Sequence, residues 1–253
     1  MNPAEYEIMY RVEDAHWWYI GLRNMILDFL TAYAPNRSPL ILDAGCGTGA
    51  VLKALGDRLR TAGIDFSVEA IRFCRIRGLV RTAAASVVAL PFPNESFDVV
   101  ISCDVLCNRS IRDKGAALCE MGRVLKPGGV FFLNLPAYQW MLSSHDSAVQ
   151  QDRRFTRREL RRLLCAASLK PVRMTHWNSL LLPPIILIRM WRKIMRRSTS
   201  DLDGGSGVLA NLLFGCALAA ERGLIRAVSA MPFGLSIFAV ARKEGLLHET
   251  LAS

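Results

Sequence analysis

This sequence of 253 residues has no closely paired cysteines and no long apolar runs, and no N-terminal leader is expected. The seven cysteines stand singly, with no C-x-x-C pair, which argues against a disulfide framework or a metal site and predicts a reducing, cytoplasmic compartment. No apolar run reaches the roughly 18 residues of a membrane-spanning helix. Because Glu5, Glu7 and Arg11 stand where a leader would be apolar, no signal peptide is expected.

Residues 1–150 have no excess of positive or negative charge, because they carry 15 Lys and Arg and 15 Asp and Glu. Residues 151–253 carry 17 against 7, so this part holds the whole net charge of +10. A basic half beside a neutral half favours an anionic partner, which would be a phosphorylated substrate, a membrane surface or nucleic acid.

The sequence does contain a regular alternation of short apolar strands and helical segments after residue 38. This alternation predicts an α/β fold with a doubly wound, mainly parallel sheet. Ser67 and Thr156 are expected helix N-caps, Thr156 in a capping box with Glu159, and residues 53–60 are expected to be helical. The expected strands are residues 39–43, 62–65, 79–83, 97–102, 129–135, 172–177 and 235–242.

The same pattern divides the chain into four parts. Residues 1–37 are expected to form two helical pieces that meet at "HWWY" and cap the fold. Residues 38–177 form the core, and residues 233–253 hold the final strand and a tail. Between them, residues 178–232 form a helical insertion that is expected to act as a lid over the site.

One short stretch, "LDAGCGTGA" at residues 42–50, fits two kinds of nucleotide site. In a dinucleotide site, the turn after the first strand binds a pyrophosphate through backbone N–H groups. Asp43 would add negative charge to such an anion site. It would instead favour S-adenosylmethionine, which has no phosphate and carries a sulfonium and an ammonium group. Asp65, at the end of the second strand, suits the ribose of either cofactor.

Four segments, "LDAGCGTG", "GIDFS", "LPFPNESFDVV" and "VLKPGGVFFLNLP", resemble in order and spacing the class I S-adenosylmethionine-dependent methyltransferases, in particular their small-molecule branch. The resemblance covers about residues 38–138. It implies a Rossmann-like sheet of seven strands with the last strand antiparallel, and S-adenosylmethionine as cofactor. "HWWY", "SSHD" and "PFGLSIFAVARK" further resemble a bacterial branch of this family, which leaves the acceptor open.

The resemblance also implies a set of cofactor contacts. It assigns the glycine loop to the methionine portion, Asp65 to the ribose and Phe66 to the adenine. The family commonly has an Asp that binds the adenine amino group where this sequence has Ser86, whose hydroxyl still accepts a hydrogen bond. Arg23 either reaches the methionine carboxylate or lies on the surface, and Trp18 packs in the core or over the cofactor. The predicted cofactor site comprises Asp43, Gly45, Cys46, Gly47, Gly49, Asp65, Phe66, Ser86, Val87, Cys103, Arg23 and Trp18.

Motifs of nucleic-acid methylation are missing. No N-P-P-Y follows the fourth expected strand, where "SCDVL" stands, and no Pro-Cys pair offers a nucleophile for cytosine carbon-5 chemistry. The basic clusters also lack interleaved aromatic residues on which bases would stack, so a nucleic-acid acceptor is not favoured. His145 and Asp146 follow the fifth expected strand, at the edge where ligands bind. They are expected either to deprotonate an acceptor hydroxyl or to form a polar surface loop.

The segment "IILIRMWRKIMRR", from residue 185, places five basic side chains on one helical face and apolar ones opposite. Such a helix either packs on a core with a solvated face or lies at a bilayer interface. The second interpretation predicts peripheral attachment to an anionic surface at the inner face of the membrane. The basic residues are Arg189, Arg192, Lys193, Arg196 and Arg197.

These observations predict an enzyme that transfers a methyl group from S-adenosylmethionine to a small or lipid-like acceptor, phosphate-bearing acceptors included. Oxygen is favoured over carbon or nitrogen as the methylated atom. Two alternatives stay open, namely an NAD(P)-dependent oxidoreductase and a non-catalytic module that binds S-adenosylmethionine or lipid.

Overall fold

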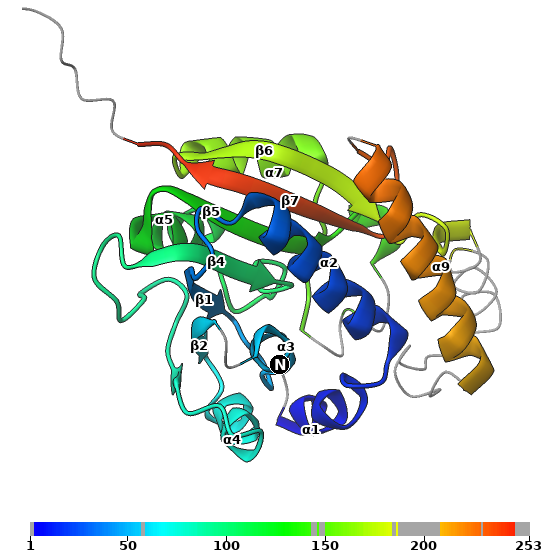
Figure 1. Cartoon of the computed structure of the whole chain (residues 1–253), viewed down its shortest axis with the longest axis horizontal. Coiled ribbons are helices and arrows are strands. Elements are labelled where there is room, and N and C mark those ends of the chain that lie inside the picture. The colour runs from blue at the N-terminus through cyan, green and yellow to red at the C-terminus, as the bar shows by residue number, and fades with distance from the viewer. Residues whose placement is uncertain are drawn as a thin grey trace, which may run out of the picture.

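A seven-stranded sheet in the order β3-β2-β1-β4-β5-β7-β6 forms the centre of the computed structural model (Figure 1). The structure describes residues 3–56, 59–142, 146, 150–183, 186, 208–228 and 230–245. Neighbouring strands pair in parallel except β7, which runs antiparallel to both β5 and β6. The predicted doubly wound sheet with an antiparallel last strand is confirmed. The strands are β1 (Leu40–Ala44), β2 (Arg60–Asp65), β3 (Thr82–Ala84), β4 (Phe97–Cys103), β5 (Leu125–Pro136), β6 (Leu169–Trp177) and β7 (Ser236–Lys243).

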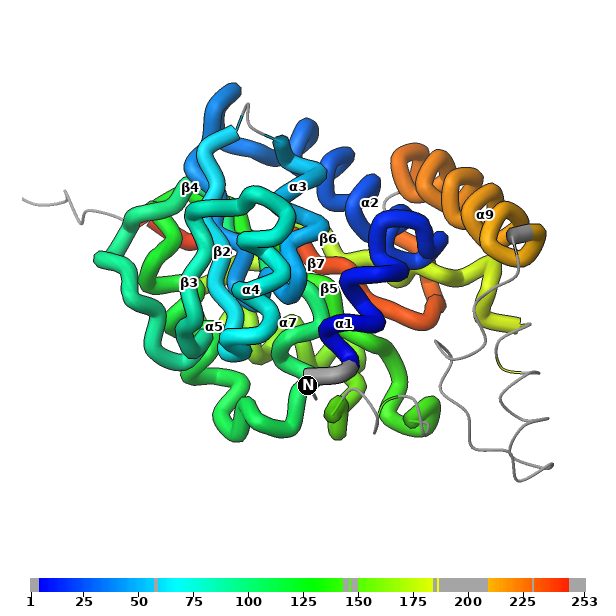
Figure 2. The backbone as a smooth tube through the Cα atoms, turned by 90° about the horizontal axis from the view of Figure 1, so that it is seen from below, coloured from blue at the N-terminus to red at the C-terminus, as the bar shows by residue number. Residues whose placement is uncertain are grey.

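Helices cover both faces of this sheet. They are α1 (Pro3–Val12), α2 (Trp17–Tyr33), α3 (Ala50–Leu55), α4 (Val68–Ile76), α5 (Lys114–Val124), the 3-10 helix η1 (Gln139–Met141), α7 (Arg157–Ala166) and α9 (Val208–Ala227). One face packs on α5 and α7, around the buried rings of Phe131 and Phe155. The other face packs on α2 and α9, which lie side by side over Trp177 and Phe238 (Figures 1 and 2).

Local sequence signals set where several helices begin. Ser67 Oγ accepts from the backbone N–H of Ala70 at 3.4 Å, and Thr156 Oγ1 accepts from that of Glu159 at 3.2 Å, so both predicted N-caps are confirmed. The predicted helix over residues 53–60 is wrong at its end. The helix stops at Leu55 because Gly56 takes a φ of 69°, outside the helical region.

The order of the strands places a ligand site at one edge of the sheet. β1 pairs with β2 on one side and with β4 on the other. Strands β1 to β3 therefore extend the sheet toward one edge, and from β4 on the strands are added on the opposite side of β1. In open α/β sheets, ligands bind outside the carboxyl ends of the strands at such a point. Helix α1 packs beside α4, where Tyr6 is buried with Ala70 and Phe73, and so lies near this edge (Figure 1).

Candidate functional site

The turn between β1 and α3 is built from glycines in backbone conformations that other residues rarely adopt. Gly45, Gly47 and Gly49 have φ angles of 95°, 53° and 90°. A Cβ on Gly45 would lie 2.1 Å from Cγ2 of Val105, so a side chain does not fit there. The backbone N–H of Gly45 donates to Ile64 O at 2.8 Å and ties the loop to β2. The loop therefore places the half-buried backbone of Gly45 and Gly47 at the carboxyl ends of β1, β2 and β4.

Asp43, which directly precedes this turn, is a buried carboxylate with one unsatisfied oxygen. Only 2% of the residue is exposed, and Oδ2 has no hydrogen-bond partner. The pKa of Asp43 is raised to about 7, chiefly by burial and also by the negative charges of Asp65 and Glu13. Since an unpaired buried charge is costly, this oxygen is suited to a ligand that brings a positive group.

Asp65, at the end of β2, connects the glycine loop, the start of α4 and helix α1 through its two carboxylate oxygens. Oδ2 accepts from the backbone N–H of Gly47 at 3.0 Å, and Oδ1 accepts from that of Ser67 at 2.9 Å. The hydroxyl of Tyr6 donates to Oδ1 at 3.1 Å, and burial next to Asp65 raises the pKa of this phenol. Tyr6 lies almost sixty residues upstream, and the sequence holds no local signal that joins the two residues.

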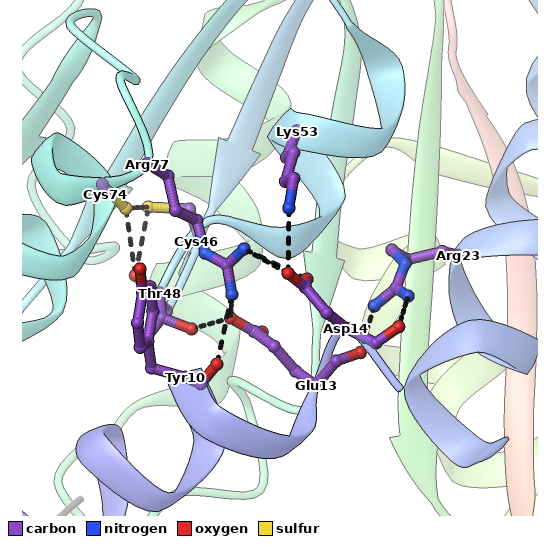
Figure 3. Close-up of polar contacts among 10 residues, drawn as sticks. Tyr10, Glu13, Asp14, Arg23, Cys46, Thr48, Lys53, Cys74 and Arg77 are labelled. Carbon is purple, nitrogen blue, oxygen red and sulfur yellow. Dashed lines mark hydrogen bonds and ion pairs between the residues drawn. The ribbon is translucent and has the colours of Figure 1, made fainter. Parts of the chain in front are cut away.

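A polar network fastens α1 and the turn after it over the glycine loop (Figure 3). Arg77, which follows α4, donates to Glu13 at 2.7 Å and to Asp14 at 3.0 Å, and Lys53 donates to Asp14 at 2.9 Å. The hydroxyl of Thr48 in the loop also bonds to Glu13. The side chains of Arg77 and Glu13 are each only 4% exposed. Sequence patterns did not identify Glu13 or Arg77, because the contact joins segments far apart in the chain.

Arg23 and Trp18, two predicted site residues on α2, contact protein groups at this edge. Arg23 Nη1 donates to the backbone carbonyl of Glu13 at 2.6 Å, and Nη2 donates to that of Asp14 at 3.4 Å (Figure 3). Trp18 stacks on Trp177 of β6, with ring centroids 6.0 Å apart. Both residues connect the first helices to the rest of the site.

Phe66, Ser86 and Val87, assigned to the adenine side, follow the carboxyl ends of β2 and β3. Phe66 is 78% exposed, and Val87 is buried. Ser86 forms an isolated bridge with Ala89, and its hydroxyl accepts from the backbone N–H of Val88 at 3.3 Å. These three residues thus lie just after the carboxyl ends of β2 and β3, with an exposed aromatic ring among them.

The two predicted cysteines lie on opposite sides of β1. Cys46 Sγ, in the glycine loop, is 3.9 Å from Sγ of Cys74 on α4, and this contact together with burial raises the pKa of Cys46. Cys103 ends β4, and burial raises its pKa, aided by the charges of Asp43 and Asp104. Both thiols therefore stay protonated at neutral pH.

Asp104, the next residue, was missed by the sequence patterns. Its carboxylate accepts two hydrogen bonds from Nδ2 of Asn134 on β5, at 3.1 and 3.0 Å. Asn134 in turn accepts from Nε1 of Trp177 on β6 at 2.7 Å. The available signal was the position of "SCDVL" directly after the fourth strand, at the ligand-binding edge.

Of the predicted pair of catalytic residues, His145 lies outside the described residues. Asp146 is buried, and Oδ1 accepts from Nη2 of Arg154 at 2.7 Å and from Nε at 3.1 Å. Arg154 is buried too, and Nη1 donates to the backbone carbonyl of Ala137 at 3.2 Å. Asp146 therefore takes part in a buried ion pair that ties its loop to the end of β5.

The predicted membrane-binding residues, Arg189, Arg192, Lys193, Arg196 and Arg197, lie outside the described residues. In the part of the chain that the structure describes, no helix is long and apolar enough to cross a membrane. Within the same part, no group of three or more His, Cys, Asp and Glu side chains is arranged to hold a metal ion.

Comparisons with known proteins agree with the architecture. The protein family described as "Methyltransferase domain" matches residues 42–133. The mouse protein named "Probable tRNA methyltransferase 9B" is 33% identical over 178 residues, which are 66% of this chain and 37% of that protein. The chain thus spans little more than a third of the length of this curated relative.

Two solved structures have the same fold. One is a methyltransferase in complex with the Haloferax volcanii Trm112 methyltransferase activator, with a TM-score of 0.63, 20% identity and coverage of 97% of this chain and 96% of that one. The other is geranyl diphosphate C-methyltransferase from Streptomyces coelicolor, bound to S-adenosylhomocysteine, with a TM-score of 0.56 and 18% identity. That match covers 87% of this chain and 79% of the other.

Proposed function

Because the chain belongs to the class I S-adenosylmethionine-dependent methyltransferases, we propose that it methylates a small or lipid-like acceptor. The observation that carries the proposal is the buried Asp43, whose Oδ2 has no hydrogen-bond partner, beside a loop of glycines with positive φ angles. The residues fit the cofactor, because the unsatisfied Asp43 Oδ2 suits its ammonium group and would repel a pyrophosphate. S-adenosylmethionine, when bound, supplies a methyl group that is activated by a sulfonium.

Different residues around the loop bind different parts of the cofactor. Asp43 pairs with the ammonium group, and Asp65 accepts hydrogen bonds from the ribose hydroxyls. Phe66, whose ring is exposed, covers one face of the adenine. Helix α1 and the turn after it cover the loop, because Glu13 in that turn binds Thr48 of the loop and Arg77, which follows α4. This cover is expected to exclude water from the site.

Tyr6 is expected to strengthen cofactor binding by orienting Asp65. Removing its hydroxyl in Tyr6→Phe leaves Asp65 with fewer donors, so the carboxylate is less well placed for the ribose. We expect about a tenfold loss of S-adenosylhomocysteine affinity in calorimetry, which corresponds to one lost hydrogen bond to a charged group. Tyr10→Phe on the same helix serves as the control. An unchanged affinity of Tyr6→Phe would show that Tyr6 only packs against α4.

The basic charge of residues 151–253 and the apolar surface of α9 support a lipid-like or phosphate-bearing acceptor. The excess of Lys and Arg lies in residues 151–253, and α9 exposes Leu209, Leu212 and Leu213. A basic part of the chain that also carries exposed leucines suits an acceptor or surface with a negative head and an apolar tail. Oxygen stays the favoured atom for methylation.

Peripheral attachment to the membrane is tested with vesicles. The full chain is expected to sediment with vesicles that contain anionic phospholipid and not with neutral ones. Gln at positions 189, 192, 193, 196 and 197 together should release most of the bound protein, whereas Gln at Arg158, Arg161 and Arg162 should not. If the unaltered chain never sediments with anionic vesicles, this attachment does not exist.

The mouse relative supports a second candidate acceptor, which is RNA. Methyl-labelled S-adenosylmethionine distinguishes the candidates when the chain is incubated with a total cell extract and the label is followed into lipid, small-molecule and RNA fractions. We expect label in the lipid or small-molecule fraction that ribonuclease does not remove. Label confined to a ribonuclease-sensitive fraction would establish the second candidate, and absence of turnover despite cofactor binding would indicate a binding module.

A further inference from the structure

Asp104 stands where the carboxyl ends of β1 and β4 diverge. Asp43 on β1 lies opposite Ile101 on β4. Asp104 comes three residues after Ile101 and directly follows the end of β4. The chain after Asp104 packs on the glycine loop, because Val105 occupies the space beside Gly45. Asp104 therefore borders the cofactor loop on the side of β1 that faces away from β2 and the ribose position.

Hydrogen bonds from the neighbouring strand hold this residue in a strained conformation. Asp104 has a φ of 56°, in the left-handed region that non-glycine residues rarely adopt outside functional sites and turns. Its backbone N–H donates to Asn134 O at 2.9 Å. Trp177 Nε1, which only donates, occupies Asn134 Oδ1 and so directs the Asn134 NH2 group at the carboxylate of Asp104. Three strands thus fix the direction of one acid.

The surroundings of Asp104 leave it without a direct cationic partner among the described residues. The side chain is only half-buried, and the titratable groups that face it are Tyr19 of α2, the Asp146–Arg154 pair, Cys103 and Cys107. The pKa of Asp104 is raised to about 7, chiefly by burial and also by the charge of Asp146, while the Asn134 hydrogen bonds and Arg154 act in the opposite direction.

Among the described residues, the other bases at this edge are less suited to proton transfer, and His145 lies outside that part of the chain. Asp146 is bound by Arg154, and Asp43 is reserved for the ammonium group of the cofactor. His176 stacks on Tyr138, with ring centroids 5.4 Å apart, and burial lowers its pKa to about 4. We propose that Asp104 is a catalytic residue that accepts the hydroxyl proton of the methyl acceptor. This inference rests on the proposed function and on an oxygen acceptor.

The step balances without a further reactant. The proton of the acceptor O–H group moves to a carboxylate oxygen of Asp104, and the oxygen electron pair forms the new bond to the methyl carbon. The carbon–sulfur bond breaks and its electron pair stays on sulfur. Asp104 ends the step as a neutral acid and releases its proton to solvent. A base with a pKa near 7 holds the right balance of both forms at neutral pH.

The first test needs no acceptor. Infrared spectra of the S-adenosylhomocysteine complex are recorded between pH 5 and pH 9, and the carboxylic C=O band is compared in the unaltered chain and in Asp104→Asn. Asn tolerates a positive φ, so the backbone is preserved. We expect one carboxyl group that titrates near neutral pH and is lost in this variant. Asp152→Asn, a nearby exposed acid, should keep it. If the variant loses no such group, the inference falls.

The second test uses the labelled methyl transfer described above. Asp104→Asn should lower the rate about 100-fold or more, while S-adenosylhomocysteine affinity stays within about threefold. The rate of the unaltered chain should rise with pH through about 7, and this rise should vanish in the variant. Equal rates in both proteins would overturn the role of Asp104 alone. No label from the unaltered chain would overturn the proposed function, and the inference with it.

Discussion

Replacing Asp43 with Asn is expected to weaken S-adenosylhomocysteine binding about 100-fold or more at pH 8. Asp43 Oδ2 is buried and receives no hydrogen bond from the protein. Asn keeps the shape of the side chain and removes the charge, so the ammonium group of the ligand would be buried without its counter-charge. Isothermal titration calorimetry measures the loss directly.

Asp98→Asn is the matched control for this substitution. Asp98 is also an acid at the sheet, but its oxygens accept from the backbone N–H of Leu40 and from Lys126, both at 2.9 Å. The control should keep its affinity within about threefold while losing some stability. Comparable affinity losses in the two variants would mean that Asp43 acts on the fold and not on the ligand.

Asp43→Asn, although it weakens ligand binding, is expected to stabilise the fold when no ligand is bound. The pKa of Asp43 is raised in the folded chain, from 3.8 to about 7, so its contribution to stability is lost as the pH rises between these values. Asp43→Asn has no such loss and should melt several degrees higher than the unaltered chain at pH 8, with the difference shrinking toward pH 4. Thermal unfolding of both proteins without ligand measures it. A lower melting temperature of the variant at pH 8 would contradict the burial of an unpaired charge.

Replacing Arg77 with Met is expected to detach α1 and to destabilise the fold by about 3 kcal/mol at pH 8. Glu13 would then be a buried carboxylate whose main cationic partner is missing. Burial raises the pKa of Glu13. At pH 5 Glu13 in the variant is therefore expected to take up a proton and lose its charge, so the loss of stability should be smaller than at pH 8. Denaturant unfolding at both pH values measures the stability, and hydrogen exchange of residues 3–12 measures the detachment.

Two further variants test whether the effect of Arg77→Met comes from its ion pair with Glu13. Arg72→Met removes an exposed arginine of α4 that pairs with Glu69, and it should cost less than about 1 kcal/mol. Arg77→Met combined with Glu13→Gln removes both charges and should recover most of the stability at pH 8. Unchanged exchange of α1 in Arg77→Met would show that apolar contacts, and not the ion pair, hold this helix in place.

The sequence predicted those parts of the fold that depend on local patterns. The capping residues Ser67 and Thr156 act through neighbours three positions away, and apolar strands alternate with helices. The glycine loop was predictable as well, because its conformation requires glycine at Gly45 and Gly49. The helix over residues 53–60 failed at Gly56, where a left-handed turn overrides the helical pattern.

The parts of the site that the sequence did not predict depend on contacts between distant segments. Tyr6 and Asp65 are separated in the chain by α2 and by the first β-α-β unit, and no periodicity joins them. The direction of Asp104 depends on Asn134 and Trp177, which come from β5 and β6. Such contacts appear only when the sheet order is known. Strand-end positions alone would have marked Asp104 as a candidate.

The central claim is that the glycine loop and Asp43 form an S-adenosylmethionine site. The most direct measurement is calorimetric titration of the purified chain with S-adenosylmethionine, S-adenosylhomocysteine and NAD under the same conditions. We expect micromolar binding of the two sulfur ligands at pH 8 and no detectable binding of NAD. Binding of NAD, or binding of none of the three, would contradict the claim.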